Sequence, residues 1–432
     1  MAGNPDMTAL SRPDMIVLGG GPAGAVSAWL AARDGLRVLL IDPAKPSLRI
    51  EGLSPRLHRW LRVTGLGDGG ATIGPFPRRV DWANQPQAVN AEYAVDRDRF
   101  DAHLRRAAES AGAQWLKTSA QLSGREVSLP GGRRLSARWM IDARGRQGRH
   151  GERSTLPFST ISICGWYRQD RPGPPGFDIT ALPEGWLWRA ALPDGRTWAQ
   201  LTTDARSPAA MEERLAQAIS RTGLPTGRFT LQSALHARAS APLLPSPVTD
   251  LSCLPVGDAL SAMDPLSGHG LFWAVSSALS AAAARRTLTA RPGTGTQMLC
   301  RRYLEKRARE TYLRNARIGR DFLRLESRFT AEPFWISRAG FPDDQPAHVP
   351  VTRAEVRPGM VIRNGLIEEM ELLHTPQEPE GIGWFDKIPA ATFWQAFSAG
   401  RTREELAATW GPMALGLFDR LATLKADCDE NA

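Results

Sequence analysis

The residues with the clearest chemistry are glycines near the start of the chain, in a turn suited to binding phosphate. The turn is Gly19-Gly20-Gly21-Pro22-Ala23-Gly24, which satisfies the pattern GxGxxG. It follows a short apolar run, Met15 to Leu18, and opens a helical pattern over 22–33. In such a turn Gly19 permits the tight bend, Gly21 lets the backbone approach a pyrophosphate, and Gly24 lets the helix pack against the strand.

A carboxylate stands where the ribose of a dinucleotide would bind. The second apolar run, Arg37 to Ile41, ends at Asp42, whose carboxylate can accept both hydroxyls of an adenosine ribose. Strand, turn, helix and strand in this order open a doubly wound α/β domain. The sequence therefore predicts dinucleotide binding, with Pro22 and Ala23 at the helix start beside the phosphates.

Two later segments indicate which dinucleotide binds. They are Leu254-Pro255-Val256-Gly257-Asp258-Ala259 and Met263-Asp264-Pro265-Leu266-Ser267-Gly268-His269-Gly270-Leu271. Together they resemble the second flavin fingerprint of the para-hydroxybenzoate hydroxylase and flavin-dependent halogenase superfamily. The resemblance implies FAD, with Asp258 on the ribityl chain. It also implies a helix start after Asp264 whose dipole faces the pyrimidine end of the flavin. The cofactor contacts expected from these segments are Gly257, Asp258, Pro265, Gly268, His269, Gly270 and Leu271.

Two further elements match the same superfamily in its order. Arg97, Phe100, Asp101 and Leu104 resemble the RxxFDxxL helix, whose arginine contacts the cofactor. The segment Ile141-Asp142-Ala143-Arg144-Gly145-Arg146 resembles the IDAxGR strand end. Arg97, Asp142 and Gly145 are therefore expected in the FAD site as well.

The residues that distinguish halogenases in this superfamily are altered here. Glu51-Gly52-Leu53-Ser54-Pro55 resembles the halogenase GExxxP element, but no lysine occurs between Lys45 and Lys117. Ser267 stands where halogenases place a glutamate, and Trp186-Leu187-Trp188-Arg189-Ala190-Ala191 departs from WxWxIP. Without that lysine we expect oxygen insertion with O2 as co-substrate, through a flavin C4a-hydroperoxide, rather than halogenation. NAD(P)H and a flavin reductase both stay open as the electron source.

Two residues are candidates for catalysis. His269 lies in the loop expected to face the flavin, where it could contact N1, the C2 carbonyl or the substrate; a structural role is the alternative. Glu51 is the second candidate, and an ion pair with a nearby arginine is its alternative. No metal is expected, because the four cysteines, Cys164, Cys253, Cys300 and Cys428, have no ligand spacing.

The tail offers a clue to the substrate. Its segment Phe393 to Ala407 is similar to the helix, G-R-T turn and second helix of small winged-helix modules that recognise leader peptides. Thr402 is expected to cap the second helix, with Glu405 completing a capping box. A helical lid supporting the flavin domain is the alternative function of the tail.

Taken as a whole, the chain resembles the flavoproteins that mature tryptophylquinone enzymes, among them the monooxygenase associated with quinohemoprotein amine dehydrogenase. The resemblance implies two hydroxylations of a peptidyl tryptophan toward cysteine tryptophylquinone. The implied partner is the small subunit of a quinone-containing amine dehydrogenase, together with its radical maturase. A halogenase, a hydroxylase of small aromatic compounds and a flavin-bearing peptide-binding module are the alternatives.

Several domains must position these residues. We expect a Rossmann-like FAD-binding domain over 1–70, 95–150 and 250–290, with an inserted antiparallel substrate domain over 71–94 and 151–249. A connecting helix over 291–340 and a winged-helix-like domain over 341–432 follow. The net charge of +9 comes from scattered arginines, so no nucleic acid is expected. No apolar run reaches membrane length and Met1 to Pro13 lacks a signal pattern, so the expected location is the cytoplasm.

Overall fold

The chain folds into two units, of which the larger contains the glycine turn. The computed structural model describes residues 12–83, 85–148, 156, 158–170, 173–222, 229–245, 247–348 and 350–430. Residues 1–11, on which most of the expectation about an export signal rests, lie outside this part. The larger unit comprises Met1–Arg285 and Leu304–Asp344, and the smaller comprises Arg286–Tyr303 and Gln345–Ala432.

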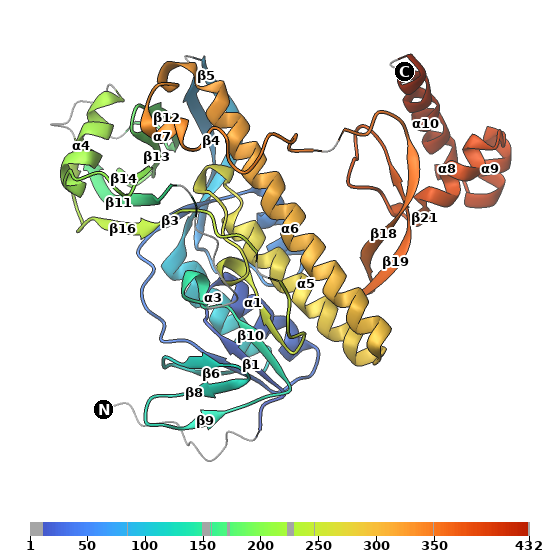
Figure 1. Ribbon diagram of the computed structural model, residues 1–432, viewed down its shortest axis with the longest axis horizontal. Helices are drawn as coiled ribbons and strands as arrows, with labels where there is room; N and C mark the ends of the chain where they lie inside the picture. The colour runs from blue at the N-terminus through green and yellow to red at the C-terminus, as the bar shows by residue number, and fades with distance from the viewer. Residues whose placement is uncertain are drawn as a thin grey trace. The chain divides into compact units, whose positions relative to one another are not determined.

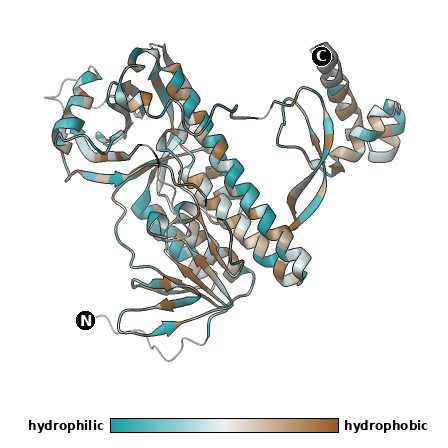
Figure 2. Cartoon of the chain, viewed as in Figure 1, coloured by the Kyte–Doolittle hydropathy of each residue, from teal (hydrophilic) through white to brown (hydrophobic). Residues whose placement is uncertain are grey.

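The larger unit is built on a five-stranded parallel sheet of order β17-β10-β1-β2-β6 (Figure 1). Its strands are β1 (Met15–Leu18), β2 (Val38–Ile41), β6 (Gln114–Leu116), β10 (Trp139–Asp142) and β17 (Cys253–Pro255). Every residue of β1 and β2 is buried, as a parallel sheet covered on both faces requires, and the strands contain many brown, hydrophobic residues in Figure 2. The helices α1 (Pro22–Arg33) and α3 (Arg97–Ser110) belong to this layer.

A nine-stranded sheet forms the second layer of the larger unit, in the order β15-β11-β14-β13-β12-β4-β5-β3, with β16 also paired to β11. All pairs are antiparallel except β12 with β4. The strands are β3 (Ile50–Leu53), β4 (Thr72–Trp82), β5 (Gln85–Asp96), β11 (Thr160–Gln169), β12 (Gly176–Leu182), β13 (Gly185–Ala191), β14 (Arg196–Asp204), β15 (Phe229–Leu231) and β16 (His236–Ala239).

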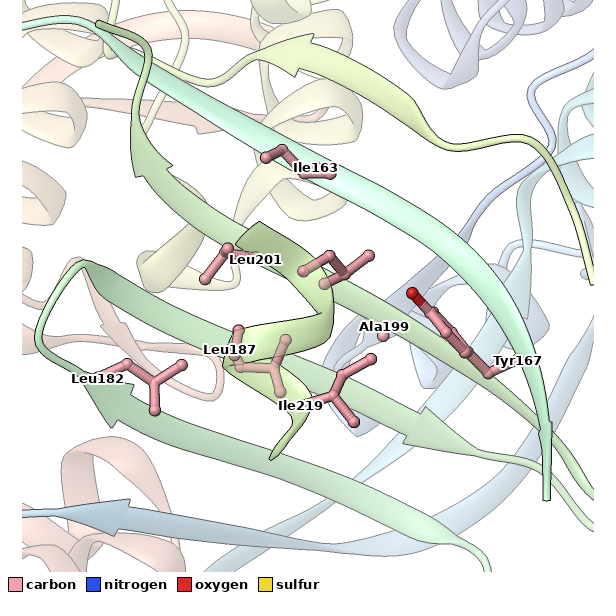
Figure 3. Packing of buried hydrophobic residues seen from close by; sticks show 9 residues of the cluster. Ile163, Tyr167, Leu182, Leu187, Ala199, Leu201 and Ile219 are labelled. Atoms are coloured by element: carbon pink, nitrogen blue, oxygen red, sulfur yellow. The ribbon is translucent and has the colours of Figure 1, made fainter. Parts of the chain in front are cut away.

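One face of this sheet packs against α4 (Met211–Arg221). Ile163, Leu187 and Leu201 from the strands and Leu215 and Ile219 from the helix form one buried cluster. Figure 3 shows the labelled side chains of this cluster meeting between strands and helix. The cluster fixes α4 on this face of the sheet.

The remaining elements of the larger unit are short, apart from two long helices. They are α2 (Pro55–Val63), α7 (Pro333–Ile336), a three-stranded sheet of β7 (Gln121–Ser123), β8 (Glu126–Ser128) and β9 (Arg134–Leu135), and the 3-10 helices Gly145–Gln147, Gly257–Ala259, Pro265–Ser267 and Ser327–Phe329. The stretch 114–129 contains the three short strands β6, β7 and β8. The long helices α5 (Gly270–Ala290) and α6 (Thr294–Leu325) contribute residues to both units.

The smaller unit pairs a hairpin with three helices. Strands β18 (Glu355–Arg363) and β19 (Leu366–His374) are antiparallel, as are β20 (Trp384–Phe385) and β21 (Ile388–Pro389). The helices are α8 (Ala390–Ser398), α9 (Arg403–Trp410) and α10 (Met413–Glu430). The capping box predicted at α9 is confirmed, because Thr402 Oγ1 accepts from Glu405 N at 3.2 Å and Thr402 N donates to Glu405 Oε2 at 2.9 Å.

The predicted α/β fold is confirmed: a parallel Rossmann-like sheet is joined by antiparallel sheets and C-terminal helices. Within the part of the chain that the structure describes, no helix has the length and apolar character needed to cross a membrane.

Candidate active site

The glycine turn between β1 and α1 forms a cradle, which is a space beside the backbone that no described part of the chain fills. A Cβ added to Gly19, which has φ +98°, would meet Ala143 O at 2.4 Å, and one added to Gly24 would meet Gly19 O at 1.8 Å. A Cβ on Gly21 would meet nothing within 4 Å. Gly19 and Gly24 are therefore required by the packing, whereas the space beside Gly21 fits an approaching pyrophosphate at the start of α1.

Asp42, just after β2, is held in a fixed orientation by the turn. Its Oδ2 accepts from Gly20 N and its Oδ1 from Ala44 N, both at 2.7 Å. Arg105 Nη1 lies 3.8 Å from Oδ1 and donates to Gly20 O at 3.2 Å. A carboxylate fixed in this way can receive the hydroxyls of a ribose.

These groups line a cleft of about 630 Å³ at the carboxyl ends of β1, β2, β10 and β17. Ligands of open α/β sheets bind at this edge. Among the residues expected at the cofactor, those lining the cleft are Gly19, Gly21, Pro22, Ala23, Asp42, Arg97, Gly145, Gly257, Asp258, Gly270 and Leu271.

The other expected cofactor residues lie around the cleft rather than in its lining. Gly24 packs beneath the turn. Asp142 is fully buried and accepts from Arg144 Nε at 2.9 Å and Nη2 at 2.6 Å, so it fixes the strand end. Pro265 and Gly268 line a neighbouring cavity.

Arg97 lies at the centre of a buried ion-pair network. It donates to both oxygens of Asp101 at 2.9 Å and to Glu51 Oε1 at 2.7 Å, while Arg49 Nε lies 2.6 Å from the same Glu51 oxygen. Burial opposes the charge on Glu51, but Arg49, Arg97 and Arg238 outweigh it and lower its pKa to about 2. Such a carboxylate is a weak base. The geometry matches the ion-pair alternative for Glu51 and gives no support to general-base catalysis by it.

A second cavity, of about 190 Å³, adjoins the cleft beneath the nine-stranded sheet. The residues lining both spaces are Glu51, Arg238, Asp258, Gly270 and Leu271. Trp186, Trp188 and Ile179 contribute apolar walls to the second cavity. The junction of the two spaces is therefore where a flavin ring in the cleft would meet a substrate.

The start of α5 lies at this junction. The first turn of a helix has amides without partners inside the helix and a partial positive charge, and Gly270 and Leu271 line both cavities. His269, by contrast, is exposed and lines neither cavity; its Nδ1 contacts Ser267 O. A catalytic role for His269 therefore receives no support from its position.

The charged side chains of the second cavity are carboxylates and arginines. Asp264 lines it, and burial raises the pKa of Asp264 despite the nearby Arg338 and Arg146. Arg78 and Glu92 form an ion pair in the wall at 2.9 Å. No lysine occurs among the described residues that line this cavity. Arg78 and Glu92 were missed from the sequence, because their meeting depends on the pairing of β4 with β5.

Comparison with protein families agrees with this geometry. The family model described as an NAD(P)-binding Rossmann-like domain matches residues 17–50, which contain the glycine turn and Asp42. The model described as tryptophan halogenase matches residues 76–345. The chain belongs to the tryptophan halogenase family. As a member of the tryptophan halogenase family, it is a flavin-dependent oxidoreductase.

Individual relatives divide between several activities. The chain is 24% identical to the flavin-dependent halogenase armH4 of Armillaria mellea over 64% of its own length and 66% of that protein. It is 35% identical to a digeranylgeranylglycerophospholipid reductase of Picrophilus torridus, over 25% of the chain and 30% of the relative. The chain thus spans less than two thirds of these curated relatives.

A solved structure in the comparison matches almost the whole chain. It is the peptidyl tryptophan dihydroxylase QhpG, essential for tryptophylquinone cofactor biogenesis, with 32% identity and a TM-score of 0.78. The similarity covers 96% of this chain and 99% of QhpG. The resemblance to maturation flavoproteins expected from the sequence is therefore confirmed as a structural similarity.

Proposed function

We propose that the chain is an FAD-dependent monooxygenase that hydroxylates a tryptophan side chain in a protein substrate, with two oxygen insertions toward a tryptophylquinone. The observation that supports this most is the 32% identity to the peptidyl tryptophan dihydroxylase over 96% of the chain. The cavity geometry supports it as well, since an aromatic-walled space adjoins the cleft at the start of α5.

In this proposal FAD lies in the larger cleft. The Gly21 cradle and the start of α1 hold the pyrophosphate, Asp42 the ribose of the adenosine, and Asp258 the ribityl chain. Gly270 and Leu271 place the start of α5 at the pyrimidine end of the flavin. Reduced FAD, when bound, supplies the activation of O2, with electrons from NAD(P)H or a flavin reductase.

The residues of the chain contribute binding, water exclusion and proton handling. Trp186, Trp188 and Ile179 hold the face of an aromatic substrate and keep water from the junction. Asp264, with its pKa raised by burial, is positioned to take up the proton that leaves the ring carbon on hydroxylation. Glu51 and Asp101 keep Arg97 ordered beside the cofactor.

Halogenation is the competing function, which the similarity to armH4 favours. It is set aside because halogenases of this superfamily use a lysine after their GExxxP element. The described lining of the second cavity contains arginines but no lysine, and Ser267 replaces the glutamate of the loop.

The proposed partner is the unmodified small subunit of a quinone-containing amine dehydrogenase, presented with its radical maturase. The smaller unit offers a means of docking it, because α8 and the capped helix α9 form the helix pair expected of a winged-helix-like module. A flavin-bearing module that binds the peptide without turnover is the further alternative.

A mass measurement separates these functions. The reduced, FAD-loaded protein is mixed with O2, chloride, bromide and the unmodified subunit, and the subunit is analysed by peptide mass spectrometry. The proposal expects one tryptophan to gain one and then two oxygens. Halogen on that tryptophan would indicate a halogenase, and an unchanged subunit with release of peroxide would indicate a binding module.

A further inference from the structure

The second cavity contains a buried ion pair to which the oxygen insertion assigns no role. Glu92 of β5 and Arg78 of β4 both line the cavity, and Arg78 Nη1 donates to Glu92 Oε1 at 2.9 Å. Their side chains are only 12% and 21% exposed. Burying charge is costly unless its hydrogen-bonding atoms find partners. The hydrogen bond from Arg78 satisfies one oxygen of the Glu92 carboxylate.

The other oxygen of Glu92 lies beside a glycine of β3. A Cβ added to Gly52 would lie 2.7 Å from Glu92 Oε2, so this position of the carboxylate requires glycine at residue 52. Among the described residues no hydrogen bond reaches Oε2. Gly52 and Glu92 both line the cavity, which leaves Oε2 as an acceptor at its wall.

The backbone of β4 explains how the pair is positioned. The pairing of β4 with β5 shifts register between Pro77 and Arg79, and Arg78 lies within that irregularity. The extra residue of this irregularity lies on β5, so Arg78 keeps the ordinary alternation of β4. Glu92 is opposite Phe76 in the ladder, and Arg78, two residues after Phe76, lies on the same face of the sheet as Glu92.

Several of the other polar side chains in the cavity already have hydrogen-bond partners. Ser162 Oγ is 2.7 Å from Ser240 Oγ, and Asp264 Oδ1 accepts from Leu266 N at 2.9 Å. Gln200 Oε1 accepts from a cysteine thiol at 3.7 Å. Two other carboxylates of this cavity, Glu51 and Asp258, also line the cofactor cleft. Asp264 is the proposed proton acceptor, so Glu92 is the carboxylate left to recognise a substrate donor.

We infer that Glu92, held by Arg78, accepts a hydrogen bond from the ring N–H of a tryptophan side chain bound in the second cavity. The inference rests on the proposed function and adds the group that selects the ring. The walls formed by Trp186, Trp188 and Ile179 contact carbon, so the indole N–H needs a polar partner elsewhere in the cavity. Glu92 Oε2 is an acceptor of this lining that has no hydrogen bond among the described residues. The same bond sets which edge of the ring is directed away from Glu92.

Binding of two matched probes tests this inference. N-acetyltryptophan amide is compared with its benzothiophene counterpart, in which sulfur replaces the N–H, by titrating the flavin absorbance of the FAD-loaded protein. A hydrogen bond to a charged acceptor predicts that the wild type prefers the indole by about 10-fold to 100-fold. In Glu92→Ala the two probes should bind with similar affinity, because the acceptor is gone.

A second variant keeps the charge and moves the acceptor. Gly52→Ala displaces Glu92 Oε2 and should reduce the preference for the indole while FAD is retained. If Glu92→Ala does not bind FAD, the inference is tested by comparing the preference for the indole probe in the wild type with that in Gly52→Ala. Equal binding of the probes to the wild type, or an unchanged preference in the variants, overturns the inference. Oxygen insertion into the protein subunit is measured separately, so loss of the preference alone leaves the proposed function standing.

Discussion

Three glycines of one turn differ in what they do for the chain. Gly19 and Gly24 leave room for other backbone atoms of the protein, whereas Gly21 faces open space in the cleft. Its backbone, with φ −70° and ψ −178°, is extended and accepts an alanine without strain. Of these three glycines, only Gly21 is not required by the packing of the chain, so a bound ligand is the reason we propose for a glycine at this position.

Alanine substitutions separate these roles. Gly24→Ala should destabilise the protein by at least about 1–3 kcal/mol, because its Cβ overlaps Gly19 O. Gly21→Ala should leave the free energy of unfolding of the FAD-free protein nearly unchanged, and weaken FAD binding roughly 10-fold to 100-fold. Urea unfolding and FAD titration measure the two effects. Full FAD affinity in Gly21→Ala would place the pyrophosphate elsewhere.

The lowered pKa of Glu51 predicts how the free energy of unfolding depends on pH. Its pKa is about 2 in the folded chain, against about 4.3 for a free glutamate. A lowered carboxylate pKa stabilises the fold above the unfolded value, and this contribution is lost as the pH falls from about 4 to about 2. Glu51→Gln should thus lower the free energy of unfolding by about 1–3 kcal/mol at pH 7.

The difference in free energy of unfolding between Glu51→Gln and the wild type should become smaller below about pH 4. Urea unfolding across pH 2–7 measures it, with Glu109→Gln on the exposed end of α3 as the control. A difference that stays constant with pH would contradict the assigned ion pairs.

Residue identity alone predicted part of the site. Asp42 and the glycine turn follow from the order of strand, turn, helix and strand along the chain, and Arg97 pairs with Asp101 four positions further along the same helix. The second partner of Arg97, Glu51, is 46 residues away, and Arg78 meets Glu92 across a bulge. Those pairs depend on strand register, which local patterns do not reveal.

At the scale of elements, α4 packs against the nine-stranded sheet, whose other face contributes Trp186 and Trp188 to the second cavity. Leu215 of α4 is completely buried in one cluster with Leu187 and Leu201 of the strands. Leu215→Ala should cost about 2–5 kcal/mol of unfolding free energy, because it leaves a void in a close-packed cluster. Leu231→Ala on β15, where the side chain is 41% exposed, is the matched control and should cost under about 1 kcal/mol.

Urea unfolding of the full chain measures both leucine variants. Similar losses in the two would mean that α4 does not support the sheet as described. Leu215→Ala should also weaken binding of an aromatic probe, because the loosened sheet contributes Trp186 and Trp188 to the second cavity.

Elements with strong periodicity agree closely with the sequence prediction. The second helix of the tail begins directly after its predicted cap Thr402, and the connecting helix expected over 291–340 is observed as Thr294–Leu325. Within 114–129, three short strands alternate with turns such as the one at Gly124, where φ is positive. Short strands depend on their partners more than on their own residues.

At the scale of the whole molecule, two spaces in the larger unit share one junction. The cleft fits a dinucleotide, the second cavity fits an aromatic ring, and the start of α5 belongs to both. The tryptophan halogenase family provides the flavin chemistry. The function proposed within that family depends on which ring the second cavity binds and on whether oxygen or a halogen is transferred to that ring.

Isotope labelling tests that claim most directly. The reduced, FAD-loaded protein is supplied with ¹⁸O₂ in ordinary water together with the unmodified small subunit, and the modified tryptophan is analysed by tandem mass spectrometry. The proposed function predicts two ¹⁸O atoms on the indole ring of a single tryptophan, even with bromide present. Oxygen derived from water, or bromine on the ring, would contradict it.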